Sequence, residues 1–204
     1  MNIALVFLSV LLYTVAFPMP GWWWFAFVAL VPFFLALDRA GGWKHRVGLA
    51  MCWVLGFVAG MGYWLFIALV GHYGVGILTA TGFVALFVCL PVCVVFIGFA
   101  VAYHFLKRPT VAFYGLVLPA LWIFIDIVKA RLPFLVPWGD IGYSVIPFTR
   151  FVQIADIGGI YGVSFLVVMV NGLIAYLVPE RKPSFSPISV SGSNFNPQNT
   201  QCMP

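Results

Sequence analysis

The chain has 204 residues, of which 64% are hydrophobic and only 7% are charged. A soluble domain carries roughly 25% charged residues, so this composition excludes a soluble globular protein and predicts a membrane protein. The net charge of +5 does not indicate a nucleic-acid partner, because the ten Lys and Arg residues are dispersed in short segments between apolar runs.

Six apolar runs approach or exceed the roughly 20 residues that a helix needs to cross a bilayer. Pro18, Pro20 and Gly21 end the first run and separate it from the second, and we expect Pro91 to kink the fourth. The predicted spans are residues 3–17, 22–37, 47–70, 75–104, 111–129 and 160–178. The sequence therefore predicts an all-α fold, a polytopic membrane bundle of about six transmembrane helices.

The basic residues predict the orientation of this bundle, because cytoplasmic loops retain Lys and Arg. Seven of them fall on one side and three on the other, which predicts cytoplasmic termini and a periplasmic segment 130–159. The seven are Arg39, Lys44, Arg46, Lys107, Arg108, Arg181 and Lys182, and the three are Lys129, Arg131 and Arg150.

A change of composition predicts two parts, a membrane domain over residues 1–180 and a disordered polar tail over 181–204. From Pro183 the chain is rich in Ser, Pro, Asn and Gln and contains no charged residue. The four cysteines have no accompanying His, Asp or Glu in a ligand spacing, so we predict neither a metal site nor a cofactor.

Asp126 and Lys129 are the leading candidates for function, because ionisable residues within a span are costly unless they are paired or face a polar cavity. Their spacing of three residues places them on one helix face. Two interpretations stay open, an ion pair that anchors the helix end at the interface and a pair that faces a substrate. Asn171, in the last span, is predicted to donate an interhelical hydrogen bond.

The segment after this helix adds four candidates, Arg131, Trp138, Tyr143 and Arg150. Aromatic residues at headgroup depth commonly anchor a protein to the interface. The alternative is an entrance for lipid, in which aromatic walls admit an acyl chain and the arginines meet a headgroup phosphate.

The order of several motifs identifies a resemblance to a known family. The motifs are Ala120-Leu121-Trp122, Asp126, Lys129, Pro137-Trp138-Gly139, Gly142-Tyr143-Ser144, Gly158-Gly159 and Asn171, with Phe17-Pro18, Trp23, Trp53, Gly56 and Gly60 in earlier spans. This pattern resembles bacterial apolipoprotein N-acyltransferase, which has Glu and Arg where this chain has Asp126 and Lys129. Lysine cannot make the bidentate contact with a phosphate that arginine makes. Gly56 and Gly60 are also expected to let helices approach closely.

The resemblance implies an enzyme of the bacterial inner membrane that acts in lipoprotein maturation. Its substrates would be a phospholipid acyl donor and a lipoprotein, whose N-terminal diacylglyceryl-cysteine receives the acyl chain. The family's nitrilase-like catalytic unit uses Cys, Glu and Lys, and no residue of this chain can be assigned these roles. We therefore expect a chain that is inactive alone, either a fragment that lacks its catalytic half or a stand-alone module.

Two other hypotheses come from different classes of protein. The first is a small transporter or channel-like protein whose cavity is lined by Asp126, Lys129 and Asn171. The second is a membrane scaffold without catalysis.

Overall fold

The computed structural model describes residues 1–17, 21–131 and 139–178. The described residues form helices and no strand, which confirms the predicted all-α fold. The 181–204 tail lies outside them, so its disorder and the proposed domain boundary stay predictions. The α-helices are α1 (Asn2–Ala16), α2 (Val31–Asp38), α3 (Trp43–Ile67), α4 (Ile77–Phe83), α5 (Leu90–Leu106), α6 (Leu118–Arg131), α7 (Thr149–Val152) and α8 (Ala155–Leu177).

Five further helical turns extend or precede these helices. The 3₁₀ helices are η1 (Trp23–Phe27) and η5 (Ile141–Val145), and the π-helical turns are η2 (Ala68–His72), η3 (Val84–Cys89) and η4 (Phe113–Val117).

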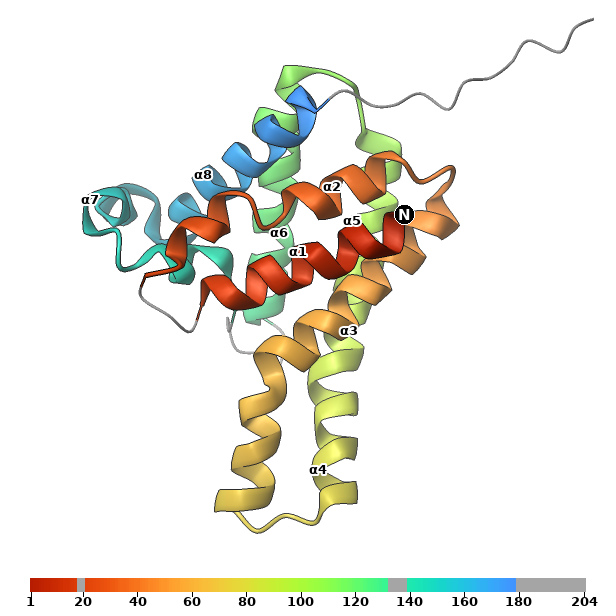
Figure 1. Cartoon of the computed structure of the whole chain (residues 1–204), viewed down its shortest axis with the longest axis vertical. Coiled ribbons are helices and arrows are strands. Elements are labelled where there is room, and N and C mark those ends of the chain that lie inside the picture. The colour runs from red at the N-terminus through yellow and green to blue at the C-terminus, as the bar shows by residue number, and fades with distance from the viewer. Residues whose placement is uncertain (18–20, 132–138, 179–204) are drawn as a thin grey trace, which may run out of the picture.

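Four helical stretches are long and apolar enough to cross a membrane, and they match the third to sixth predicted spans. They cover Trp43–His72, Ile77–Leu106, Phe113–Arg131 and Ala155–Leu177. The first two predicted spans form shorter apolar helices, over Asn2–Ala16 and Trp23–Asp38. Together they make the helical membrane bundle of Figure 1, in which α1 lies along α2 and α3.

The second predicted span is not one continuous helix, because a turn separates η1 from α2. Side chains from two other helices satisfy the backbone of this turn: Ser9 Oγ donates to the Ala29 carbonyl at 2.7 Å, and Asn171 Nδ2 donates to the Ala26 carbonyl at 2.8 Å. The Leu30 N–H donates to Asn171 Oδ1 at 2.8 Å. Irregular backbone is tolerated at membrane depth only with such partners. The predicted role of Asn171 is confirmed.

The core of the bundle is built on two buried indole rings, Trp53 of α3 and Trp122 of α6. The rings meet edge to face with their centroids 5.6 Å apart. Phe33 and Phe96 pack against both rings, and Phe99 packs against Trp122. Aromatic pairs of this kind contribute about 0.5–1.5 kcal/mol each beyond the area they bury. The aromatic core fixes α3, α5 and α6 relative to one another.

Two glycines of α3 let α1 approach closely, as the sequence predicted. A Cβ on Gly56 would lie 2.9 Å from Val10 Cγ1, and a Cβ on Gly60 would collide with the Thr14 hydroxyl. Close approach of backbones is the main source of packing energy between helices in lipid.

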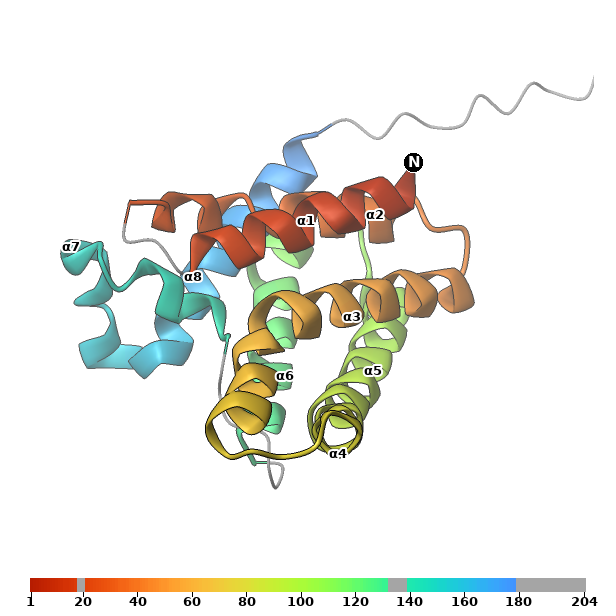
Figure 2. The ribbon, with the colours of Figure 1, turned by 60° about the horizontal axis from the view of Figure 1, so that its bottom comes forward.

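The far half of the hairpin formed by α3 to α5 projects away from the body of the molecule. Figure 1 shows this arm extending downward, and Figure 2 shows α4 at its end, seen end-on. Each of the two helical stretches of the whole hairpin has 30 residues, or about 45 Å of helix, which exceeds the ~30 Å hydrocarbon core. Pro91 does not end the second stretch, because the preceding turn widens into the π-helix η3, which accommodates the missing N–H.

A polar network joins α2, α5 and η4 at the end of the bundle opposite Arg131. Asp38 pairs with Lys107 at 2.5 Å. Its two carboxylate oxygens also accept hydrogen bonds from Tyr103, at 2.7 Å, and Tyr114, at 2.8 Å. This carboxylate has a donor for each oxygen, so its burial is well compensated. We call Asp38, Tyr103, Lys107 and Tyr114 the inner cluster.

Candidate functional site

Helix α6 places Asp126 and Lys129 on one buried face near its C-terminal end. Lys129 Nζ lies 2.7 Å from Asp126 Oδ1, which confirms the ion pair predicted from their spacing. Asp126 is 1% exposed and Lys129 is 6% exposed. The lysine therefore does not extend to the surface of the protein, and its charge is paired inside it.

Asp140 completes the cluster, and the sequence analysis missed it. Its Oδ1 lies 2.9 Å from Lys129 Nζ, and its side chain is fully buried. Asp140 occupies the N-cap position of η5 but makes no capping hydrogen bond with its side chain. An aspartate in this position is typical of a helix cap, so the sequence offered no signal for the longer-range contact. We call Asp126, Lys129 and Asp140 the outer cluster.

The backbone just before Asp140 is held by α1 and α3. Tyr13 of α1 donates its hydroxyl to the Gly139 carbonyl at 2.6 Å. Gly139 has a positive φ of 75°, and a Cβ there would lie 2.8 Å from the Phe57 ring. Only glycine combines this conformation with so close an approach. The loop formed by Gly139 and Asp140 is therefore fixed by α1, α3 and α6 together.

The segment that follows is held by α8. The Gly142 N–H donates to Ser164 Oγ at 3.0 Å, and a Cβ on Gly142 would lie 2.9 Å from the Ile160 carbonyl oxygen. Gly159 kinks the start of α8 with a φ of 61°. Gly142 thus allows a close contact with α8, and Gly159 allows the bend in that helix.

The outer cluster has more carboxylate than cation, and part of it lacks hydrogen-bond partners. Among the described residues, no hydrogen-bond donor reaches Asp126 Oδ2 or Asp140 Oδ2, and no acceptor reaches Trp122 Nε1. Burial raises the pKa of the Asp140 carboxyl above its usual value, while the Lys129 ammonium acts in the opposite direction. Such unsatisfied groups cost stability, which marks the outer cluster as more than a packing device.

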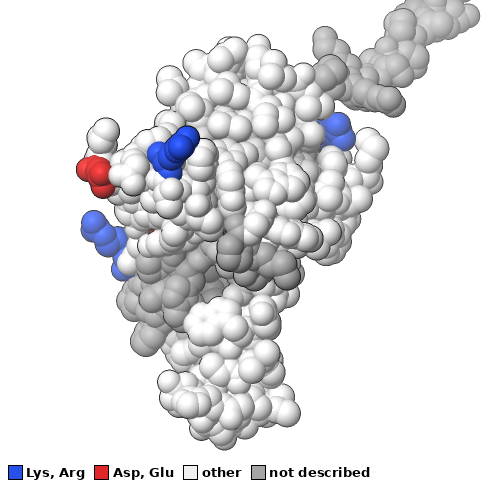
Figure 3. All heavy atoms as spheres, turned by 60° about the vertical axis from the view of Figure 1, so that its left-hand side comes forward, with Lys and Arg blue, Asp and Glu red and all other residues white. Residues whose placement is uncertain are grey.

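The remaining candidates lie on the outside of the molecule. Tyr143 is 39% exposed, and Arg131 and Arg150 are also exposed. Arg150 belongs to α7, which stays on the body through ring contacts between Trp23 and Phe148, with centroids 4.8 Å apart. Figure 3 shows how few charged side chains interrupt the surface on this side.

The structure therefore divides the candidates into two sets. Asp126 and Lys129 are brought together in the buried outer cluster, whereas Arg131, Tyr143 and Arg150 are exposed. Trp138 lies outside the described residues. The part of the chain that the structure describes contains no group of three His, Cys, Asp or Glu side chains that could hold a metal ion.

Most of the chain is similar to known proteins. The family model of the apolipoprotein N-acyltransferase N-terminal domain matches residues 9–173. The apolipoprotein N-acyltransferase of Geobacter metallireducens is 28% identical over 187 residues, which cover 89% of this chain and 35% of that protein. The protein of the same name from Borreliella burgdorferi is 27% identical over 167 residues, which cover 76% of this chain and 28% of that protein.

The chain thus spans about a third of the length of these relatives. The matched region includes the outer cluster, the glycine contacts and most of α8. On this match, the chain belongs to the family of the apolipoprotein N-acyltransferase N-terminal domain.

Proposed function

We propose that residues 1–180 form the membrane part of an apolipoprotein N-acyltransferase and present a phospholipid acyl donor and a lipoprotein to a catalytic part. The observation that carries this proposal is the family match over residues 9–173, which contains the loop held by the outer cluster. A loop fixed by three helices suits a site that must orient two lipid substrates.

Within this proposal, the outer cluster acts as a positioning device. Lys129 joins α6 to Asp140, and Asp140 leads directly into η5, where Tyr143 is exposed. Tyr143, together with Trp138, contacts acyl chains or the interface, and the exposed Arg131 and Arg150 pair with phosphate oxygens, for which guanidinium is well suited.

We also propose that the protein lies in the inner membrane with both termini in the cytoplasm. The basic residues favour this orientation: the end of the bundle near the inner cluster carries Arg39, Lys44, Arg46, Lys107 and Arg108. Single cysteines at Arg150 and Lys44 in a cysteine-free chain would test it. An impermeant maleimide added to spheroplasts should label Arg150→Cys and spare Lys44→Cys, and the reverse pattern would refute the orientation.

We further propose that this membrane part transfers no acyl chain by itself. The family's chemistry needs a thiolate beside a base. The described cysteines, Cys52, Cys89 and Cys93, lie in the spans, and the sulfurs of Cys89 and Cys93 are 3.9 Å apart. None of them contacts the outer cluster in the hydrogen bonds or ion pairs of the described residues.

An acyl-transfer assay with two proteins tests the proposal. The first is the chain alone, and the second is residues 1–178 continued by the remaining part of the Geobacter metallireducens relative. Both are reconstituted with phospholipid and a diacylglyceryl-lipopeptide, and mass spectrometry follows the mass of an added acyl chain. We expect the added mass with the continued protein only. Turnover by the chain alone would refute its inactivity, and a folded but inactive continued protein would refute the assigned membrane role.

The transporter hypothesis receives little support from the same residues. Both Nδ2 hydrogens of Asn171 are used by the Ala26 and Val167 carbonyls, and its Oδ1 is used by the Leu30 N–H. Lys129 is paired with two carboxylates. Asn171 therefore has no donor left for a solute, and Lys129 is held inside the protein by its two ion pairs. Solute flux in vesicles that contain the chain would reverse this conclusion.

A further inference from the structure

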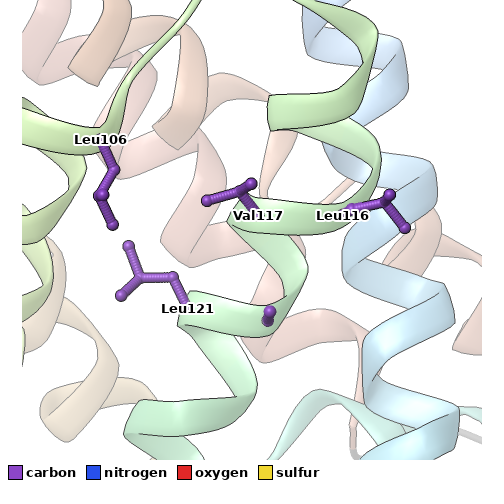
Figure 4. Close-up of a pocket in the computed structure, with 5 residues that line it drawn as sticks. Leu106, Leu116, Val117 and Leu121 are labelled. Carbon is purple, nitrogen blue, oxygen red and sulfur yellow. The ribbon is translucent and has the colours of Figure 1, made fainter.

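An apolar groove of about 430 Å³ opens on the surface of the bundle between α5 and the helix formed by η4 and α6. It is lined by Leu106, Leu116, Val117, Ala120 and Leu121. In Figure 4, the side chains of Leu106, Val117 and Leu121 point toward one another across the space between the two helices. Its volume lies within the range of about 300–1,000 Å³ that is typical of ligand sites.

The residues of the π-helical turn η4 are divided between the body of the bundle and the groove. Phe113, Tyr114 and Gly115 are buried against the body, and Tyr114 donates its hydroxyl to Asp38. Leu116 and Val117, the last residues of the same turn, line the groove and are 60% and 39% exposed. Single π-helical turns inside α-helices are rare and are frequent at functional sites.

The loop of residues 107–110 joins the two walls of the groove and carries its charge. Lys107 is paired with Asp38 of the inner cluster. Arg108 is exposed and makes no ion pair with any residue in the described ranges. Thr110 then begins the second wall, and its hydroxyl accepts the Phe113 N–H at 3.2 Å. Arg108, two residues after the lining residue Leu106, therefore offers a guanidinium that has no ion-pair partner among the described residues.

The lining residues of the second wall, Leu116 to Leu121, cover five residue steps, or about 7.5 Å of helix. They belong to a helical stretch that is apolar enough to cross a membrane, so a groove on this helix adjoins acyl chains. An apolar groove whose lining residue Leu106 lies two residues from the exposed Arg108 fits one class of ligand, a phospholipid with an anionic headgroup.

We propose that this groove is a binding site for an anionic phospholipid, with the headgroup phosphate on Arg108 and one acyl chain between Leu106 and Leu121. The site differs from any site for an acyl donor around Tyr143, because α6 runs from the groove end of the bundle to the outer cluster at the other end. In the proposed orientation the ligand belongs to the cytoplasmic leaflet. The inference does not depend on acyl transfer.

Two variants of the full chain test the two halves of the site. Arg108→Gln removes the guanidinium, and Ala120→Phe fills the groove. The chain is purified from vesicles that contain equal amounts of phosphatidylglycerol and phosphatidylethanolamine, and native mass spectrometry measures the retained lipid. We expect preferential retention of phosphatidylglycerol, reduced about fivefold in Arg108→Gln, as for the loss of one basic contact with an anionic lipid.

A phosphatidylglycerol with a photoreactive acyl chain tests the position of the chain itself. We expect crosslinks on residues 106–121 in the natural chain and their loss in Ala120→Phe.

Matched controls keep the test specific. Lys44→Gln removes another exposed cation near the same end, and Ala85→Phe adds the same ring at an exposed position of the arm. Both should behave as the natural chain. Equal retention of the two lipids, equal losses in variants and controls, or unchanged lipid crosslinks on residues 106–121 in Ala120→Phe would each overturn the proposal.

Discussion

The inner and outer clusters use similar residues in opposite proportions. The inner cluster surrounds one carboxylate, Asp38, with one lysine and two tyrosine hydroxyls. The outer cluster surrounds one lysine, Lys129, with two carboxylates. Both are buried at the ends of the same bundle, so they face comparable costs of removing charge from water.

The difference between them is one of hydrogen-bond satisfaction. Each oxygen of Asp38 has a donor, whereas Asp126 Oδ2 and Asp140 Oδ2 have none among the described residues. A satisfied buried network stabilises a fold, and an incompletely satisfied one is retained for another reason, such as function. The difference supports a structural role for the inner cluster and the proposed positioning role for the outer cluster.

The largest effect is expected from Lys129→Met, which leaves two buried carboxylates without their cation. Breaking a buried pair by removing one partner costs about 3–5 kcal/mol, measured as the free energy of unfolding in detergent micelles. Lys129→Arg keeps the charge and should lose less. A Lys129→Met protein as stable as the natural chain would break the comparison, because the cluster would then not hold the loop.

A smaller loss of stability, measured in the same way, is expected from Asp38→Asn in the inner cluster. Hydrogen bonds to charged groups contribute about 1.5–3 kcal/mol, and this variant weakens those from Tyr103, Tyr114 and Lys107. Acyl transfer by the continued protein, per folded molecule, should be unchanged. A specific loss of activity would show that the inner cluster is not purely structural.

Gly139→Ala sharpens the comparison, because it moves the loop of the outer cluster without changing charge. A side chain at a φ of 75° and 2.8 Å from the Phe57 ring should cost roughly 1–3 kcal/mol. Acyl transfer should fall further than stability does, since misplacement by about 1 Å lowers a rate by as much as 10²-fold. Gly21→Ala, at an open position, serves as the control.

The smallest change in stability is expected from Asp140→Asn. One carboxylate still pairs with Lys129, and the excess of acid is removed, so the free energy of unfolding should change by no more than about 1.5 kcal/mol, the size of a single hydrogen bond. Activity of the continued protein should nevertheless fall, because η5 loses its ionic contact with α6. Unchanged activity would refute the positioning role of Asp140.

Much of the bundle was predictable from composition and periodicity. Runs of apolar residues predict four spans that the structure forms as helices, because length and hydrophobicity alone decide whether a helix can cross a bilayer. The spacing of Asp126 and Lys129 predicts their ion pair for a similar reason, since both lie on one helix.

The features that the sequence analysis missed depend on residues far apart in the chain. The turn that divides the second span is stabilised by Asn171, 141 residues from Leu30. Tyr13 reaches Gly139 across 126 residues, and Asp140 contacts Lys129 from outside helix α6, although only 11 residues separate the two. No local pattern specifies such partners.

The sequence by itself determined that this protein is a helical membrane protein, where its main helices lie and which family it resembles. These properties follow from apolar content and from short-range spacing along a helix. Only the tertiary structure decided that Asp140 completes the outer cluster, that Asn171 supports a broken span and that a groove opens beside η4. These depend on which helix faces pack together, and in lipid that choice is made by close packing and by buried polar contacts between distant residues.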